Sequence, residues 1–293
     1  MKRVHVLGAG GPAGVLLCRC LRDLPGVEVT GWDDAPWARL LMEVPQSRDH
    51  LSADLVIPVP DILVREWAGV QNTFLPEAET IDRCQDKSKT ARLLGDLAPH
   101  TYWVRETTGA GGRGARQEMA AQYLPGRNLS CELVYWSEDA VPLCFAKERL
   151  SYSVSHREPN VGGVGTSMVS RCIAPGDLFA MADKAIRRIS KSPLPQGIFG
   201  VDFREDQWGT PRITEINAGR FLTASYVYYY RTGYNLPRLM VERRLGLEPT
   251  ELAPYPEGIG IVRQVDHEPW VGPMNSLASM WDTKEACTHE PLL

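Results

Sequence analysis

The first 82 residues show apolar and polar positions in a repeating strand and helix pattern. The period changes between about two and about 3.6 residues, and the segments run over residues 3–8, 12–24, 26–34, 38–45 and 53–61. Strands that alternate with helices in this way pair in parallel. The pattern therefore predicts a parallel βαβ unit over residues 1–82.

Strand patterns dominate after residue 82 and are expected to pair locally. Helical periodicity recurs at residues 82–97, 175–192 and 236–247. Strand patterns occur at 101–107, on either side of Pro125–Gly126, and at 140–150, 197–206 and 210–219. A polar turn separates the last two runs, which is the signal of a hairpin. The tail after about residue 267 has little periodicity and is expected to pack over the surface. Together these elements indicate an α/β protein.

Composition and charge narrow the class of protein. Hydrophobic residues make up 43% and charged residues 23% of the 293 positions, as in globular chains of two or three compact units. A net charge of −4 and a pI near 5.9 give no basis for nucleic acid as a general partner. No apolar run reaches the ~18 residues of a membrane span, and the N-terminus has no signal-peptide pattern.

The seven cysteines are odd in number and include no Cys-x-x-Cys pair. Their spacing therefore indicates neither a zinc site nor a disulfide framework. Several lie in apolar segments, where a reduced cysteine behaves as a small hydrophobic residue. We expect reduced thiols and a cytoplasmic protein.

Glycines cluster first between the initial strand and helix, at Gly8, Gly10, Gly11 and Gly14. Such a turn lets a helix N-terminus approach an anion, and an acid at the end of the second strand, Asp33 or Asp34, could hold a ribose hydroxyl. The dinucleotide fingerprint fits only with Ala13 in its last place. Two hypotheses stay open, a nicotinamide cofactor site and a turn whose glycines permit helix–sheet packing.

A second glycine cluster, VRETTGAGGRGA, occupies residues 104–115 after a predicted strand. No Lys-Ser or Lys-Thr pair follows its last glycine, which excludes a Walker A loop. The backbone N–H groups of such a loop can close over a triphosphate. A surface hairpin is the alternative, and the loop alone does not decide between them.

The predicted hairpin at 197–219 carries polar side chains on one face. Side chains alternate along a strand, so Glu215 and Asn217 point together. Pairing through the 206–209 turn brings Asp202 to the same face. Two carboxylates and an amide oxygen suit Mg²⁺, which takes few protein oxygens and completes its shell with phosphate and water. A solvated hairpin face is the alternative, and the adjoining apolar residues disfavour it.

Five stretches in order resemble the ATP-grasp enzymes. They are Asp86-Lys87, VRETTGAGGRGA, QYLPGRNLSCELV, GVDF and TEINAGRF. The resemblance covers most of residues 3–265 and is strongest to the carbamoyl-phosphate-synthase and biotin-carboxylase branch. It implies a Rossmann-like preATP-grasp unit, a small lobe with a Gly-rich lid, and a C-terminal lobe with the metal site and tail, over residues 1–82, 83–125 and 126–293.

The resemblance also implies roles for the nucleotide-binding residues. Lys87 and Arg105 take the places of two cations that contact ATP phosphates, and Arg113 is the loop arginine. The lid over the β- and γ-phosphates comprises Gly109, Gly111, Gly112 and Gly114. The linker that reads adenine through its backbone comprises Gln122, Tyr123 and Leu124. Asn128 takes the ribose-binding position.

The same resemblance makes Asp202, Glu215 and Asn217 the ligands of Mg²⁺, with Mn²⁺ as an alternative ion. Arg220 is placed at the acyl-phosphate site, although one extra residue separates it from Asn217. Arg105 stands where lysine is usual, which keeps the charge but changes the geometry. Ala121 replaces an acid of the linker, and Asn128 binds a hydroxyl without charge assistance.

The activity implied is ATP-dependent ligation. A small-molecule carboxylate attacks the γ-phosphorus, an acyl phosphate forms, and an amine or similar nucleophile displaces phosphate. Such a site positions groups and neutralises charge, which fits cations, oxygens and glycines without an evident nucleophile. Two alternatives remain, an NAD(P)-dependent oxidoreductase using the first glycine cluster and a nucleotide-binding regulatory protein without turnover.

The carboxylate and amine substrates are not identified by the sequence. Arg149 and Arg157 lie where related enzymes shape the acceptor pocket and are candidate anion contacts, with surface arginines as the alternative. The tyrosine-rich segment 225–235 is expected as a packed helix rather than a pocket wall. The family resemblance is also compatible with a homodimer.

Overall fold

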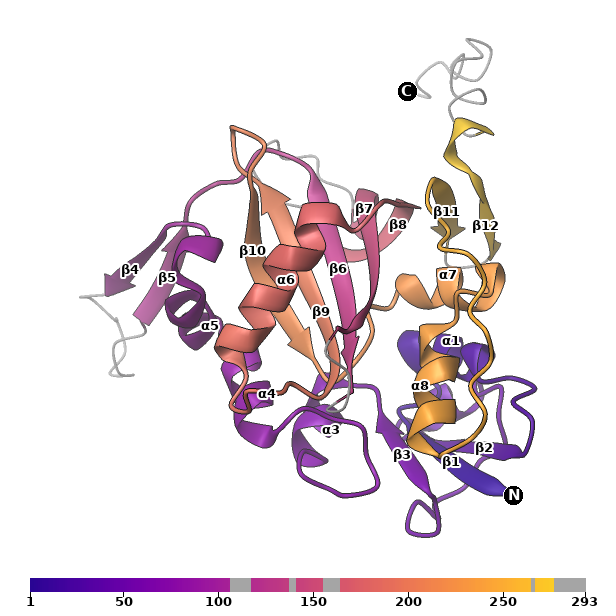
Figure 1. Cartoon of the computed structure of the whole chain (residues 1–293). Helices are drawn as coiled ribbons and strands as arrows, with labels where there is room; N and C mark the ends of the chain where they lie inside the picture. Colours follow the sequence, from indigo (N-terminus) through magenta and orange to yellow (C-terminus); the bar gives the residue numbers. More distant parts are fainter. Residues whose placement is uncertain (106–116, 137–140, 155–163, 265–266, 277–293) are drawn as a thin grey trace, which may run out of the picture.

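The structure is a computed structural model that describes residues 1–105, 117–136, 141–154, 164–264 and 267–276 (Figure 1). Its α-helices are α1 (Pro12–Cys20), α2 (Pro36–Arg39), α3 (Asp61–Glu66), α4 (Ala78–Gln85), α5 (Lys87–Leu94), α6 (Gly176–Ile189), α7 (Ser225–Thr232) and α8 (Leu236–Arg244). Its strands are β1 (Lys2–Leu7), β2 (Val27–Trp32), β3 (Leu55–Pro58), β4 (Thr101–Arg105), β5 (Gln117–Ala121), β6 (Asn128–Tyr135), β7 (Leu143–Val154), β8 (Val164–Cys172), β9 (Gly197–Glu205), β10 (Pro211–Ala218), β11 (Ile259–Gln264) and β12 (His267–Pro273).

The N-terminal sheet is parallel, in the order β2-β1-β3. This confirms the strand and helix order predicted from the pattern of residues 1–82. The strands β4 and β5 form a second, two-stranded antiparallel sheet.

The third sheet has seven strands in the order β10-β9-β6-β7-β8-β11-β12, and each described pair is antiparallel. Alternate residues such as Leu133 and Phe203 pack with Ala185 and Ile186 of α6, which lies along that face (Figure 1). Full burial of a Leu, Ile or Phe side chain contributes about 1.5–3 kcal/mol. The apolar face is thus held by α4 and α6, and the alternation turns polar residues of the same strands to the other face.

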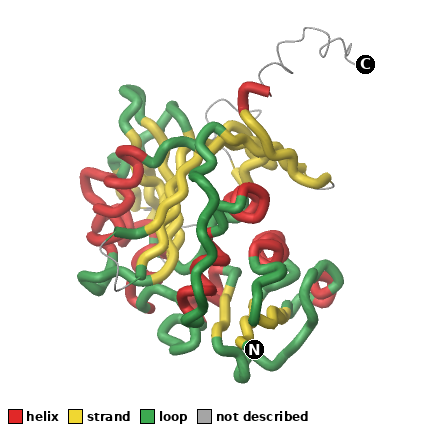
Figure 2. The backbone as a smooth tube through the Cα atoms, turned by 45° about the vertical axis from the view of Figure 1, so that its right-hand side comes forward, coloured by secondary structure: helices red, strands yellow, loops and turns green. Residues whose placement is uncertain are grey.

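The chain returns to its N-terminal unit after the large sheet. Helices α7 and α8 lie beside α1 over the N-terminal strands (Figure 1), and the turned view separates this body from the large sheet (Figure 2). One core cluster joins Val4 and Leu17 to Tyr226 and Met240. The tyrosine-rich segment is therefore a packed helix, as the sequence predicted. No helix among the described residues has the length and apolarity to cross a membrane.

The predicted helix at 82–97 is in fact interrupted at Asp86. This residue has an extended backbone and caps α5, because its side chain accepts the N–H groups of Ser88 and Lys89 at 2.9 and 3.0 Å. A carboxylate that satisfies two free N–H groups stabilises a new helix start. The apolar period continues across the break, so periodicity alone did not show it.

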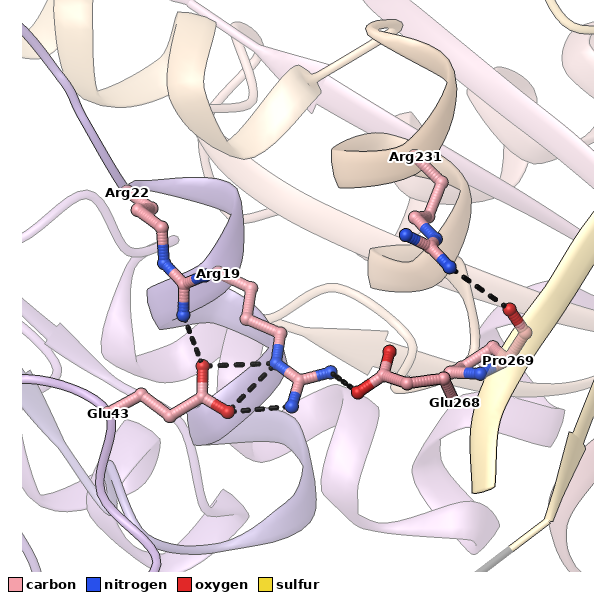
Figure 3. Close-up of polar contacts among 6 residues, drawn as sticks. All are labelled: Arg19, Arg22, Glu43, Arg231, Glu268 and Pro269. Carbon is pink, nitrogen blue, oxygen red and sulfur yellow. Dashed lines mark hydrogen bonds and ion pairs between the residues drawn. The ribbon is translucent and has the colours of Figure 1, made fainter.

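The tail contains an edge strand, β12, which corrects the expectation of irregular surface packing. Figure 3 shows how Glu268 and Pro269, near the start of this strand, contact arginines of the helices. Arg19 of α1 lies 3.4 Å from the Glu268 carboxylate and 2.6 Å from that of Glu43, and Arg231 donates to the Pro269 carbonyl at 3.4 Å. These contacts tie the edge strand to α1 and α7.

Candidate nucleotide and metal site

The polar face of the large sheet carries the residues predicted to hold a metal. Glu215 lies directly opposite Asp202, and Asn217 lies opposite Gly200. The row of paired residues extends across the next two strands, since Ser130 of β6 lies opposite Asp202 of β9 on one side and opposite Lys147 of β7 on the other. The three predicted oxygen donors therefore share one face, as alternation indicated.

A β-bulge makes this arrangement compatible with the core. The register between β9 and β10 shifts between Ile213 and Glu215, so Thr214 is the extra residue. Ile213 and Ile216 are three apart yet both are buried, with exposures of 1% and 2%. Regular alternation would send them to opposite faces. The bulge lets both reach the core while Glu215 stays on the polar face.

Arg149, predicted as a substrate contact, pairs with Asp202. The two side chains are 17% and 15% exposed and form an ion pair across β6. Burial is the largest single influence and lowers the pKa of Arg149, but the Asp202 carboxylate and the Tyr152 side chain together raise it above its ordinary value. A guanidinium thus occupies the side of Asp202 toward β7.

Arg220 lies beside Asn217 despite the extra residue between them. Its guanidinium donates to Asn217 Oδ1 at 2.9 Å and to the Asp61 carboxylate of α3 at 3.2 Å. Gly219 makes the turn with φ of 89°, and a Cβ there would lie 2.5 Å from Val64 Cγ1. Only glycine accepts both the dihedral angle and the close approach of α3. The turn at Gly219 therefore accommodates the extra residue and leaves Arg220 beside Asn217.

A cavity of about 360 Å³ is lined by four of the residues predicted to bind a nucleotide. Lys87, Gln122, Tyr123 and Leu124 all line it, together with Ile213 and Thr214 of β10. Leu124 is buried, whereas the Tyr123 ring is 53% exposed. The Gln122 N–H donates to the His100 carbonyl at 2.8 Å. That amide is engaged within the chain, so it is not an open donor for a base.

Arg204 is a cavity residue that the sequence analysis missed. It lines the same cavity, its guanidinium lies 5.9 Å from the Tyr123 ring centroid, and its Nε is buried without a partner among the described residues. Asn128, predicted for the ribose, is its register neighbour on β6 and does not line the cavity. Arg204 lies two positions after Asp202, so the alternation that found Asp202 would have found it.

Several predicted residues lie outside the described residues. They are Gly109, Gly111, Gly112, Arg113, Gly114 and Arg157. Arg105 is the last residue of β4 and lies opposite Gln117 of β5.

Glu132 and Lys147 form a buried network that no motif signalled. Each side chain is 1% exposed, and Lys147 Nζ lies 3.6 Å from Glu132 Oε2. Glu132 also accepts the N–H of Leu222 at 2.6 Å and the hydroxyl of Tyr229 at 3.2 Å, and Lys147 contacts Ser225. Burial lowers the pKa of Lys147, and the Glu132 carboxylate opposes that shift. The network fastens the segment that follows Arg220 to the sheet.

Two glycines of the first cluster, Gly10 and Gly14, are packed closely against the chain, whereas Gly8 lines a cavity at the ends of the strands. A Cβ at Gly10 would lie 2.0 Å from the Ala38 carbonyl oxygen, and one at Gly14 would lie 2.0 Å from the Gly8 oxygen. The Asp33 carboxylate accepts the N–H groups of Gly10 and Ala35 at 3.2 and 3.0 Å. Gly10 and Gly14 therefore serve packing, and Asp33, one of the two acids predicted for a ribose, is used to hold the turn. This arrangement disfavours the nicotinamide hypothesis.

A cavity of about 840 Å³ lies between α1, α7 and α8. Its guanidinium groups are engaged within the chain, since Arg19 pairs with Glu43 and Arg238 with Glu242 at 2.9 Å. It offers little uncompensated charge to a nucleotide. The described residues also contain no cluster of three or more His, Cys, Asp or Glu side chains, so two carboxylates and an amide remain the best oxygen set.

Comparison with solved structures identifies the fold. An L-amino acid ligase from Bacillus licheniformis superposes with a TM-score of 0.58 at 15% identity, over 89% of this chain and 79% of that one. N5-carboxyaminoimidazole synthetase from Staphylococcus aureus gives a TM-score of 0.62 at 15% identity, over 89% and 82%.

A protein from Archaeoglobus fulgidus assigned to the ATP-grasp superfamily gives a TM-score of 0.59 at 15% identity, over 92% of this chain and 94% of that one. No protein-family model and no curated protein sequence matches the chain. At this level of identity the comparisons establish the fold, and the chain has the ATP-grasp fold.

Proposed function

We propose that the protein is an ATP- and Mg²⁺-dependent ligase that activates a small-molecule carboxylate as an acyl phosphate and transfers it to an amine. One observation carries this proposal. The β9–β10 hairpin lines the nucleotide cavity through Arg204 and Thr214 and bears Asp202 and Glu215 on its polar face. A base-sized cavity and a metal-type oxygen set thus adjoin on one hairpin.

The side chains suit the parts of ATP they would meet. Leu124 and Ile213 give the cavity apolar walls for a planar base, and Lys87 supplies a cation for phosphate. Asp202, Glu215 and Asn217 would hold Mg²⁺, which neutralises phosphate charge when bound.

The two arginines beside that oxygen set would handle the reacting anions. Arg220 is oriented by Asp61 and Asn217, so it can stabilise charge at the carboxylate as the acyl phosphate forms. Arg149 would exchange its pairing with Asp202 for an anionic substrate oxygen. We assign residues 1–82 as the preATP-grasp unit, 83–125 as the small lobe and 126–293 as the C-terminal lobe.

A nucleotide-binding regulatory protein without turnover is the competing function. The observation that favours it is the Arg149–Asp202 ion pair, which neutralises a carboxylate that a cation would need.

Release of ADP from ATP distinguishes the ligase from the regulatory protein. We expect release in the presence of Mg²⁺ to require both a carboxylate and an amine, screened as mixtures, to stop with EDTA, and to return with Mg²⁺ or Mn²⁺. ATP binding without ADP release in any mixture would support the regulatory function instead. Release that needs no added carboxylate would contradict ligation.

Arg204→Gln is expected to weaken binding of a non-hydrolysable ATP analogue by about tenfold or more. The variant removes a charged donor from the cavity, and a hydrogen bond to a charged group contributes about 1.5–3 kcal/mol. Calorimetric titration measures the effect. Arg65→Gln, at an exposed arginine paired with Asp82, should leave the affinity unchanged. Equal affinities of the two variants would remove Arg204 from the site.

A further inference from the structure

A second cavity, of about 660 Å³, opens where the strands of the N-terminal sheet end. Leu7 and Trp32 are the last residues of β1 and β2, and both line it together with Pro60, which follows β3. Ligands of open parallel sheets bind in the crevice at the carboxyl ends of the strands. This cavity shares no lining residue with the nucleotide cavity.

Aromatic rings form much of the cavity wall. Trp32 and Trp67 line it and are half-buried, which leaves part of each indole open. The His50 ring packs edge-on against Trp67 with 5.1 Å between centroids. Trp32 is held by a hydrogen bond of 3.0 Å from its Nε1 to Asp34. The Trp32 ring already carries Arg39 and Arg48 at 4.6 and 4.5 Å from its centroid, so Trp67 is the aromatic side chain left to contact a planar ring through stacked or edge contacts.

The cavity also presents one guanidinium and one carboxylate that form no ion pair among the described residues, although the Asp34 carboxylate accepts the Trp32 Nε1–H. Arg48 rests 4.5 Å from the Trp32 ring centroid, and within the described part of the chain no carboxylate pairs with it. Asp34 lines the cavity, whereas the Asp33 oxygens are engaged by backbone N–H groups. Arg39 stacks on Trp32 as well but does not line the cavity. A ligand with a separate carboxylate and ammonium complements these two charges.

We propose that this cavity binds an amino acid with a planar aromatic side chain. The ring lies against Trp67, the α-carboxylate pairs with Arg48, and the ammonium pairs with Asp34.

The first turn of α3 connects the cavity to the catalytic face. Pro60 and Ile62 line the cavity, and Asp61 between them holds Arg220 beside Asn217. An amino acid bound here borders the site proposed for acyl-phosphate formation. Because Arg48 holds its carboxylate, its amino group is the one left to react, after the ammonium has given up one proton to solvent. The inference that the ligand is the amine substrate rests on the proposed function, whereas binding itself does not.

Calorimetric titration of the full chain without ATP tests the binding. We expect L-phenylalanine to bind at least about tenfold tighter than L-alanine, 3-phenylpropionate or 2-phenylethylamine, each of which lacks one of the three groups. Arg48→Gln should weaken phenylalanine and phenylpropionate but not phenylethylamine. Asp34→Asn should weaken phenylalanine and phenylethylamine but not phenylpropionate. Arg3→Gln, at the other end of β1, should change nothing.

Equal binding of phenylalanine and alanine, or variants that leave this pattern unchanged, would overturn the proposal. A thermal unfolding curve of each variant shows whether it is folded, and Trp67→Leu gives an independent loss of ring selectivity. Stimulation of ADP release by phenylalanine then supports its role as substrate. If phenylalanine binds but does not stimulate ADP release, while another amine does, the cavity remains a binding site and phenylalanine is not the amine substrate. Absence of ADP release with every amine would instead count against the proposed ligase.

Discussion

Glu215→Gln is expected to lower the rate of ADP release by about 10²–10³. The substitution keeps the size of the side chain and its place opposite Asp202 on the hairpin. It removes one of two carboxylate charges from the oxygen set and so weakens the hold on Mg²⁺. Losing one preorganised charge-stabilising group costs a rate factor of this order. The loss should appear in kcat, and the Mg²⁺ concentration needed for half-maximal rate should rise.

The matched control is Glu248→Gln, at an exposed position after α8. It should retain the parental rate and the parental Mg²⁺ dependence. A Glu215→Gln protein that releases ADP as fast as the control would contradict the assignment of Glu215 as a metal ligand. Retained nucleotide affinity in the slow variant would place the defect in the metal set rather than in the base cavity.

Lys147→Met is expected to lower the free energy of unfolding by about 3–5 kcal/mol. Glu132 would remain buried at 1% exposure without its cation, and removing one partner of a buried ion pair costs about this much. The double variant Glu132→Gln with Lys147→Met should recover part of the loss, because no unpaired charge stays buried. Urea denaturation followed by circular dichroism measures all three proteins.

Lys191→Met provides the comparison at an exposed ion pair. Its ammonium lies 3.3 Å from Glu79 with 58% of the side chain exposed, and such pairs contribute about 0–1 kcal/mol. A Lys147→Met protein no less stable than this control would show that Lys147 does not stabilise the fold. If Lys147→Met were as stable as the double variant, the unpaired Glu132 charge would not be the cause of the lost stability.

Local periodicity was sufficient for most elements. The β9–β10 hairpin, α6, α8 and the parallel order of β1–β3 are where the apolar and polar pattern predicted them. Alternation also predicted that Asp202 and Glu215 would face the same side. The hairpin and the helices follow from residues close together in the chain, and the parallel order of β1–β3 follows from the alternation of strand and helix patterns.

Contacts between segments far apart in the chain could not be predicted from local periodicity. The break at Asp86 depends on a side chain that caps the backbone, while the apolar period runs on unbroken. The pairing of Arg149 with Asp202 needs β6 between β7 and β9. The Glu132–Lys147 network needs β6, β7 and α7 together. The strand β12 is set by pairing with β11 rather than by its own pattern.

The sequence by itself determined which side chains are candidates to bind phosphate and metal, since charge and alternation are properties of the local chain. The tertiary structure alone decided how they are placed. The bulge at Thr214 turns Glu215 to the polar face while Ile213 and Ile216 stay in the core, and Gly219 lets α3 bring Asp61 to Arg220. The reason is physical: burial of apolar residues on one face of the sheet fixes the strands, and only then do the polar residues on the other face acquire defined neighbours.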